Sequence, residues 1–125
     1  MTNQLSDNFL RVAKEEVKEE IESVQKILSS CKNDSDISLN GNAIEKHMHK
    51  IKGLAPMMNQ NDIGEISQMI DKILKHIIEN GKLSGIYEIL TESNYTMKQL
   101  LEGPPPKDVE EVKKRIKNTF PDIFV

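Results

Sequence analysis

Apolar residues recur every three or four positions in five segments of this 125-residue chain, and no segment sustains an alternation of period two. That spacing places the apolar side chains on one face of a helix, whereas a half-buried strand requires alternation. Aromatic residues make up 4% of the chain and Trp is absent, so a core has to consist of aliphatic side chains. The sequence therefore predicts an all-α domain and argues against a β-sandwich or barrel.

The five helical segments differ in length and in the residues at their ends. Three of the segments begin at Asn42, Asp62 or Asp108. Each of these residues is followed three positions later by Glu, a pattern that resembles a capping box. In the first segment a stripe that begins at Phe9 and ends at Cys31 is expected to be buried. The expected ranges are about 5–31, 42–58, 62–80, 84–101 and 108–116.

Turn-forming residues separate the segments. The stretch KNDSDISLNGN predicts a loop, Pro56 is expected to kink or end the second helix, and Asn80-Gly81 is a helix stop. Gly103 and the run 104–106 of three prolines end the fourth helix. We therefore expect an up-and-down antiparallel four-helix bundle over residues 1–103, with a short C-terminal fifth helix. Residues 104–125 then form a Pro-rich break, that helix and an apolar tail, which packs on the bundle or leads to a linker.

Charge and cysteine content narrow the class of protein. The net charge is −3, and 15 of the 17 cationic residues are lysines scattered among acidic neighbours, which argues against nucleic-acid binding. The single Cys31 excludes an internal disulfide. The N-terminus does not resemble a signal peptide, and no stretch approaches the ~20 apolar residues of a membrane span. We expect a cytoplasmic protein without membrane insertion.

The histidines of the second segment differ in their surroundings. Helical geometry places His47 on the shoulder of the apolar face and His49 about 150° from its centre, facing water. Lys46 and Lys52 lie three residues to either side of His49 and share its face. Gly53 follows, although Gly within a helix costs about 1 kcal/mol relative to Ala. An exposed imidazole between two ammonium groups, beside bare backbone, suits a phosphoryl group.

The decapeptide His49-Lys50-Ile51-Lys52-Gly53-Leu54-Ala55-Pro56-Met57-Met58 resembles the H-x-x-K-G-x-[AS] signature of histidine phosphotransfer (HPt) domains. It is most similar to the N-terminal phosphotransfer domain of chemotaxis histidine kinases of the CheA type. The resemblance covers about residues 5–101, because the order and spacing of the helices also match. It implies an HPt-like four-helix bundle.

The resemblance also implies a role for each matching residue. His49 matches the phosphoaccepting histidine, Lys52 the lysine that contacts the phosphoryl group, and Gly53 the glycine that lets a partner approach. Asp71 matches a Glu whose carboxylate accepts a hydrogen bond from the other ring nitrogen. Since Asp is one methylene shorter, Gln68, one turn earlier, is the alternative.

Three other positions near the signature bear on the match. Lys46 matches a position that is often basic, although a solvated surface lysine is an equal interpretation. Asn59 and Gln60 replace the family's Gly and aromatic residue after the motif helix, and Asn tolerates the left-handed conformation of a tight turn.

The implied partners are a histidine kinase catalytic domain, which donates the phosphoryl group, and the receiver domain of a response regulator, whose Asp accepts it. ATP and Mg²⁺ would be held by these partners, with no cofactor or metal in this chain. The sequence contains no P-loop and nothing similar to an ATP-binding kinase domain. Both a stand-alone phosphorelay protein and the N-terminal part of a histidine kinase fit the sequence.

Two other hypotheses were weighed. A non-catalytic helical adaptor would bind a protein partner through Phe9 or the apolar tail 120–125, and it leaves Gly53 and the cationic surroundings of His49 without a reason. A metal site built from the three histidines is disfavoured, because residues two apart on a helix point in nearly opposite directions. His47 and His49 therefore cannot chelate one ion.

Overall fold

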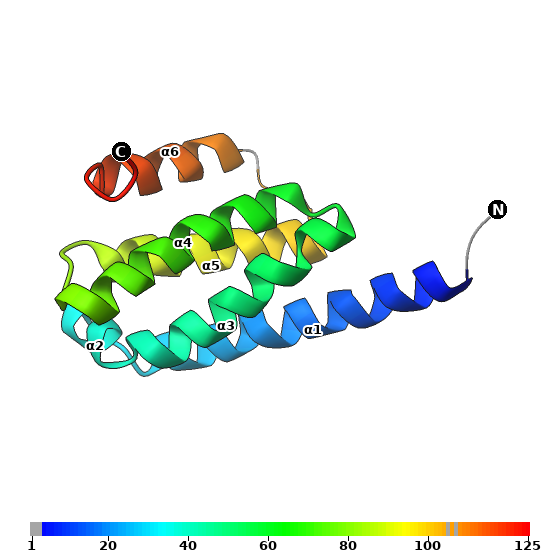
Figure 1. Cartoon of the computed structure of the whole chain (residues 1–125), viewed down its shortest axis with the longest axis horizontal. Coiled ribbons are helices and arrows are strands. Elements are labelled where there is room, and N and C mark those ends of the chain that lie inside the picture. Colours follow the sequence, from blue (N-terminus) through cyan, green and yellow to red (C-terminus); the bar gives the residue numbers. More distant parts are fainter. Residues whose placement is uncertain (1–3, 105, 107) are drawn as a thin grey trace.

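All regular secondary structure in the described part of the chain is helical (Figure 1). The computed structural model describes residues 4–104, 106 and 108–125, with side chains from residue 7 onward, so Pro105 of the proline run lies outside it. No helix within these ranges has the length and apolar character needed to cross a membrane. The elements are α1 (Gln4–Ser29), α2 (Asp34–Leu39), α3 (Gly41–Leu54), the 3₁₀ turn η1 (Pro56–Met58), α4 (Asn61–Asn80), α5 (Ile86–Glu102) and α6 (Val109–Thr119).

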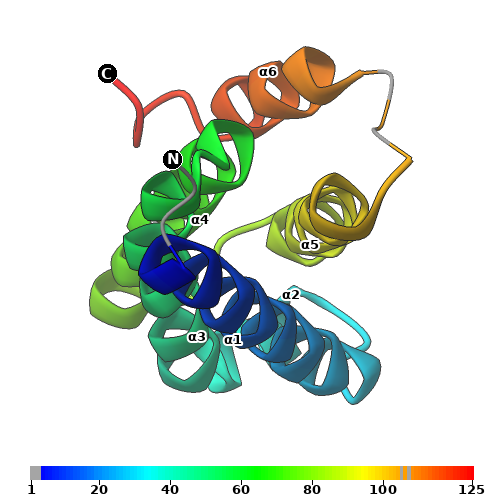
Figure 2. The ribbon, with the colours of Figure 1, turned by 90° about the vertical axis from the view of Figure 1, so that its right-hand side faces the viewer.

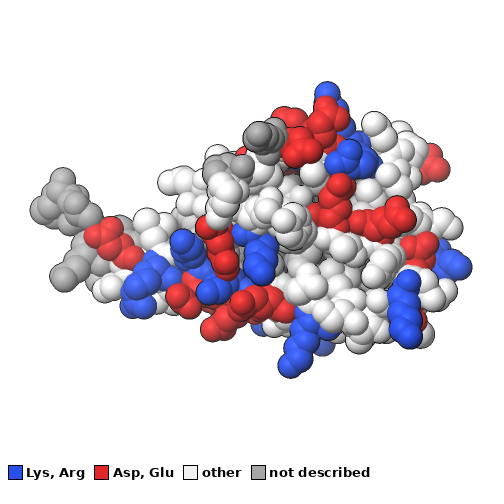
Figure 3. Space-filling model, turned by 180° about the vertical axis from the view of Figure 1, so that it is seen from behind, with Lys and Arg blue, Asp and Glu red and all other residues white. Residues whose placement is uncertain are grey.

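The long helices α1, α3, α4 and α5 enclose the core. α1 packs on α3 and α5, and α4 packs on the same two helices from the other side, as the end view shows (Figure 2). α6 lies outside this group and contacts α4 and α5. On the face opposite to that in Figure 1, acidic and basic side chains are interspersed (Figure 3), which agrees with the scattered charge of the sequence.

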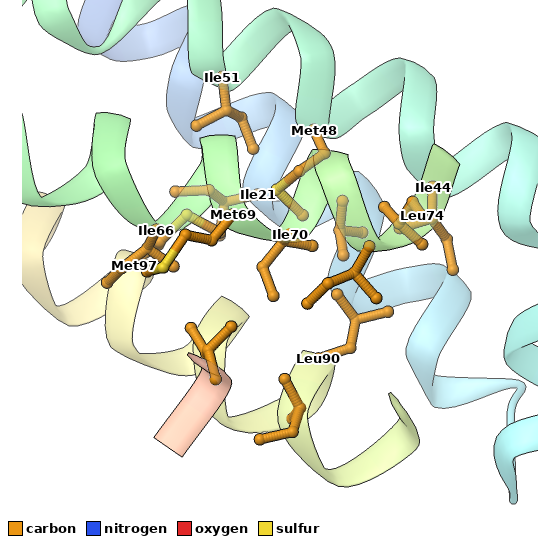
Figure 4. Close-up of a cluster of buried hydrophobic side chains, with 14 of the residues drawn as sticks. Ile21, Ile44, Met48, Ile51, Ile66, Met69, Ile70, Leu74, Leu90 and Met97 are labelled. Atoms are coloured by element: carbon orange, nitrogen blue, oxygen red, sulfur yellow. The ribbon is translucent and has the colours of Figure 1, made fainter. Parts of the chain in front are cut away.

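The apolar stripes of the long helices meet in one aliphatic core (Figure 4). The stripe of α1 is buried from Ala13 onward, but the side chain of Phe9 is 41% exposed. The expectation that the buried stripe begins at Phe9 is therefore wrong, because the first turns of α1 extend past the neighbouring helices (Figure 1). Core residues labelled in Figure 4 are Ile21, Ile44, Met48, Ile51, Ile66, Met69, Ile70, Leu74, Leu90 and Met97.

The segment predicted as a loop after α1 contains the short helix α2, so this expectation is wrong and the C-terminal helix is the sixth. Asn33 caps α2 by accepting a hydrogen bond from the backbone N–H of Asp36 at 2.9 Å, and Ile37 anchors it in the core. Asp34 accepts hydrogen bonds from the backbone N–H groups of Gly85 (3.0 Å) and Tyr87 (2.8 Å). Asp34 therefore satisfies amides at the start of α5, which local residues leave without an acceptor.

We expect Asp34→Ala to lower the free energy of unfolding by about 2 kcal/mol, the range of hydrogen bonds to a charged acceptor. Hydrogen bonds from the backbone of Tyr87 and then Gly85 lower the pKa of Asp34. Its stabilisation is therefore complete above the unfolded-state pKa and is lost as the pH falls through the folded-state pKa. Urea unfolding at neutral and acidic pH should show the wild-type and variant curves converging in acid. A difference that does not change with pH would contradict this role.

The junction between α3 and α4 is a tight, packed turn. α3 ends at Leu54, and Pro56 begins η1, so Pro56 ends the helix rather than kinking it. Asn59 adopts the left-handed conformation with φ of 60°, as the sequence predicts for this position. A Cβ on Gly64 would lie 3.1 Å from Cγ of Pro56, so the glycine allows α4 to approach η1 closely. This turn fixes the pairing of α3 with α4, the two helices that carry the candidate site.

The predicted capping boxes are wrong. α3 begins at Gly41 after Asn40, α4 begins at Asn61 after Gln60, and neither preceding residue, nor Asp108 before α6, makes a side-chain cap. Two of the residues assigned to these boxes, Asp62 and Glu65, pair with a lysine of α6. The ammonium of the buried Lys113 of α6 donates to Asp62 (2.7 Å), Glu65 (2.9 Å) and Glu110 (3.1 Å). Burial disfavours this cation, but the three carboxylates outweigh burial and raise the pKa of Lys113.

The ends of α4 and α5 and the tail follow the sequence more closely. α4 stops at Asn80, and Gly81 has φ of 90° with an extended ψ, a conformation that suits only glycine. α5 starts at Ile86, two residues later than expected, and Leu101 is its last buried residue. In the tail, Phe120 is buried in the core, which leaves it unavailable to a partner.

Candidate functional site

The candidate site lies where α3 passes α4. His49, on the outward flank of α3, has 61% of its side chain exposed, as its position on the helix predicts. Asp71 faces it from α4, with a side chain that is 2% exposed. The nearest distance between them joins Nδ1 of His49 and Oδ2 of Asp71 and is 3.9 Å. That distance is too long for a hydrogen bond but allows one after a small movement of the exposed ring.

The buried carboxylate of Asp71 is held by two lysines. Oδ2 accepts from Nζ of Lys52 at 2.9 Å and pairs with Nζ of Lys75 at 3.1 Å. Oδ1 is buried and has no hydrogen-bond donor among the described groups while Glu45 is ionised. The Asp71 oxygen that faces His49 is therefore the same one that holds the two lysines.

Glu45 is a second carboxyl group at the site, one turn before His49 on α3. Its Oε2 lies 3.9 Å from Nδ1 of His49. The pKa of Glu45 is raised. The largest cause is a hydrogen bond with Asp71, and burial and the negative charge of Asp71 add to it. Burial opposes ionisation of Asp71, but hydrogen bonds from Glu45, Lys52 and Lys75 outweigh it and lower the pKa of Asp71. On acidification Glu45 therefore takes up a proton before Asp71, and Asp71 stays the anionic partner of the histidine.

The remaining predicted site residues lie around this group. Gln68 is exposed and lines a surface cavity of about 210 Å³ together with Lys52, Asp71, Lys72 and Lys75. Oδ2 of Asp71 lies 3.9 Å from Nδ1 of His49, and among the described groups no hydrogen bond joins Gln68 to His49.

One lysine and one glycine complete the α3 surface beside the site. Lys46 is exposed, and no ion pair ties it to the described groups at the site. Gly53 is also exposed, and a Cβ built on it meets no atom within 4 Å. The packing of this chain therefore does not require a glycine at position 53.

Sequence reasoning missed Glu45 and Lys75 as members of the site. Each is one helical turn from a residue that it identified: Glu45 precedes His49 by four residues, and Lys75 follows Asp71 by four. Residues four apart share a helix flank, so this spacing was an available signal. Glu45 was instead assigned to a capping box, and Lys75 was not considered.

The other two histidines make different contacts. Nδ1 of His47 lies 2.7 Å from Oε1 of Glu20, a residue of α1, and 27% of the His47 side chain is exposed. Nδ1 of His76 lies 3.4 Å from the side-chain amide nitrogen of Asn80. The nitrogen Nδ1 of each of the three histidines therefore faces a different side chain.

A different group has ligand atoms at metal-binding spacing. One carboxylate oxygen of Glu45, one ring nitrogen of His49 and one carboxylate oxygen of Asp71 all lie within 4.8 Å of one another. A divalent cation there would have to displace the ammonium groups of Lys52 and Lys75 from Asp71 or lie beside them. The two lysines therefore disfavour a divalent cation at Asp71.

Comparison with known proteins provides no family assignment. No family model, no curated protein and no solved structure matches this chain. Evidence for the function of this chain therefore comes from the sequence signature and from the geometry of the site.

Proposed function

We propose that this chain is a histidine phosphotransfer module of two-component or phosphorelay signalling. In this proposal His49 accepts a phosphoryl group from a kinase catalytic domain and passes it to an Asp of a response-regulator receiver domain. The observation that carries the proposal is the exposed His49 imidazole, 3.9 Å from a buried carboxylate that also binds Lys52 at 2.9 Å. The similarity to CheA-type domains makes chemotaxis signalling the proposed setting.

The proposed architecture is an up-and-down antiparallel four-helix bundle of α1, α3, α4 and α5. The packing of α1 and α4 on the same two neighbours supports it, as does the tight turn through η1 between α3 and α4. Such a bundle suits phosphotransfer, because a nucleophile in the middle of a rigid helix is presented to two different partners in the same geometry.

The proposed chemistry consists of two displacements at phosphorus. The lone pair of His49 Nε2 attacks the terminal phosphorus of ATP held by the kinase domain; the N–P bond forms, the P–O bond to ADP breaks, and ADP leaves. A carboxylate oxygen of the receiver domain then attacks the same phosphorus, and the N–P electron pair returns to Nε2. A proton on Nδ1 is retained throughout. Oδ2 of Asp71 and Oε2 of Glu45 both lie 3.9 Å from Nδ1, and Asp71 is the proposed acceptor because its pKa is lowered whereas that of Glu45 is raised.

Lys52 is proposed to offset the charge that phosphorylation adds, about −2 at neutral pH. Its ammonium is already held near His49 through Asp71, and 31% of its side chain is exposed, so it has access to a group on the ring. An ammonium ion held in place before the reaction stabilises developing charge without the cost of reorganising.

We expect Gly53→Ala to raise the free energy of unfolding by about 0.5 kcal/mol and to slow phosphotransfer to a receiver domain. Alanine favours the helix, and the open space around Gly53 accepts its methyl group without a clash. That same methyl group would occupy the surface at which a partner backbone approaches. Urea unfolding and transfer kinetics measure the two effects. A variant that gains stability and transfers at the wild-type rate would show that Gly53 is unrelated to partner docking.

Incubation with a kinase core tests the proposal. The protein is mixed with labelled ATP and the catalytic core of a chemotaxis kinase, and a receiver domain is added after labelling. We expect acid-labile, base-stable label on the wild type and on His76→Gln, the matched control, and none on His49→Gln. Receiver domain should remove the label. No label on the wild type, with a core that phosphorylates its own cognate domain, would instead favour the helical adaptor.

A further inference from the structure

The contacts of Nδ1 differ among the three histidines, and they decide which ring nitrogen has a lone pair. A carboxylate only accepts hydrogen bonds, so the 2.7 Å contact with Glu20 requires that Nδ1 of His47 donates. In the neutral ring Nε2 then has the free lone pair. The Asn80 amide also donates to the carbonyl oxygen of His76 at 3.0 Å, which fixes its nitrogen toward that ring. Nδ1 of His76 is therefore the acceptor, and Nε2 carries the proton.

The residues around His47 repeat those around His49 on the other flank of α3. Lys50 follows His47 by three residues, as Lys52 follows His49. Each lysine pairs with the carboxylate that faces its histidine: Lys50 lies 3.9 Å from Oε1 of Glu20. Glu20 is 8% exposed and is fixed by its place on α1. α3 thus carries two overlapping H-x-x-K pairs, one facing Asp71 on α4 and one facing Glu20 on α1.

We propose that His47 is a second phosphoryl acceptor, with Nε2 as the nucleophile and Glu20 as the positioning residue. The hydrogen bond to Glu20 is already formed at His47, whereas His49 is 3.9 Å from either carboxylate. Lys50, with 57% of its side chain exposed, is the cation available to the added phosphoryl group. The substrates of this site are small phosphoryl donors with a good leaving group, since they reach a half-buried ring without a docking face.

Phosphoramidate is a donor of this class and defines the reaction. The lone pair of His47 Nε2 attacks phosphorus of the protonated donor, the N–P bond to the ring forms, and the P–N bond to the leaving group breaks. Ammonia leaves with the electron pair and takes up a proton from water. The proton on Nδ1 of His47 stays on the ring, where it neutralises part of the new charge and remains hydrogen-bonded to Glu20.

The test uses phosphoramidate on the full chain, with mass spectrometry to locate the label. His76 is the matched control, because it is also half-buried but its Nε2 is protonated. In His49→Gln we expect His47 to be labelled at least about tenfold faster than His76, the preference that a hydrogen bond to a charged group gives one tautomer. Label on His47 no faster than on His76 would overturn the proposal.

A second comparison tests Glu20 through a property that a merely structural role would not change. Glu20→Ala in the same His49→Gln background should slow labelling of His47 by about tenfold. Nitrogen NMR of the imidazoles should show His47 with protonated Nδ1 in the parent and a mixture of tautomers after the change. If Glu20→Ala does not fold, the NMR spectrum of the parent alone decides, and a protonated Nε2 on His47 would contradict the proposal.

This inference is independent of the proposed function. Phosphoramidate needs no kinase domain, so failure of kinase labelling at His49 leaves the result for His47 unchanged. Conversely, an unlabelled His47 does not affect kinase-dependent labelling of His49. His47→Gln with His49 intact separates the two, and in that variant phosphoramidate should label His49 but not position 47.

Discussion

Neutralising the three carboxylates around Lys113 is expected to lower the free energy of unfolding by about 3 kcal/mol, because it leaves a buried ammonium without a counter-charge. The variant is Asp62→Asn with Glu65→Gln and Glu110→Gln. The Lys113 side chain is 8% exposed, whereas the three carboxylates are about half exposed or more. The buried ammonium therefore relies on the three carboxylates to stabilise its charge. The carboxylates are solvated by water and rely on the ammonium less. Urea unfolding of the wild type and the variant, fitted together, gives the change in the free energy of unfolding.

Removing the lysine instead provides the matched control. Lys113→Met keeps the apolar stem and leaves carboxylates that water solvates, so we expect a loss of about 1 kcal/mol. In the Lys113→Met background, neutralising the three carboxylates should cost little more. Two results would contradict the dominant role of the buried ammonium. One is an equal loss of stability in Lys113→Met and in the triple carboxylate variant, and the other is additive losses when the two are combined.

Asp71→Ala is expected to slow phosphoryl transfer through His49 by 10- to 100-fold, the usual effect of removing a carboxylate that orients a functional histidine. The variant removes the acceptor that faces Nδ1 of His49 and releases Lys52 from its 2.9 Å contact. Transfer rates from a kinase core to the chain, compared with the wild type at equal concentrations, measure the effect.

Lys75→Met is the matched control for that experiment, because it also breaks an ion pair with Asp71 but leaves the carboxylate and Lys52 in place. We expect its rate to stay within a few-fold of the wild type. A wild-type rate in Asp71→Ala, measured in protein that is fully folded by circular dichroism, would remove Asp71 from the proposed mechanism. A loss in Lys75→Met as large as in Asp71→Ala would assign the effect to the charge of the cluster as a whole.

The long helices were predictable because each presents an apolar stripe over several turns, and the stripe marks the face that is buried. How far along the helix that face is covered depends on the neighbouring helices, as the exposure of Phe9 shows. α2 was not predictable in this way, since six residues give less than two turns of periodicity. Its stability depends on the anchor Ile37 and on the pairing of Asp34 with amides that are 51 and 53 residues away. Contacts at that separation leave no local pattern in a sequence.

The predicted helix caps failed for a related reason. An acidic residue followed three positions later by Glu satisfies the local pattern of a capping box, as at Asp62 and Glu65. In the folded chain both carboxylates bind Lys113, which is 51 and 48 residues away. A buried ammonium attracts them more strongly than backbone amides that water can reach. Glu45 likewise makes no cap at the start of α3 and lies beside His49 and Asp71.

The candidate site was predictable where it depends on helical phase and not where it depends on distances between helices. The phase of α3 places His49 in water and Lys52 on its flank, and the order of the helices brings Asp71 to face it. The phase does not show that Glu20 reaches His47, because that contact requires the packing of α1 on α3. Distances between helices follow from the packed core, which no single segment specifies.

Locating the phosphoryl group after reaction with a kinase core tests the central claim most directly. Wild-type chain is labelled from ATP by a chemotaxis-kinase catalytic core, kept in base and fragmented for tandem mass spectrometry that separates His47 from His49 within one peptide. We expect the phosphoryl group on His49, and phosphorus NMR should show that it is attached to Nε2. Kinase-dependent label on another residue, with His49 unmodified, would contradict it.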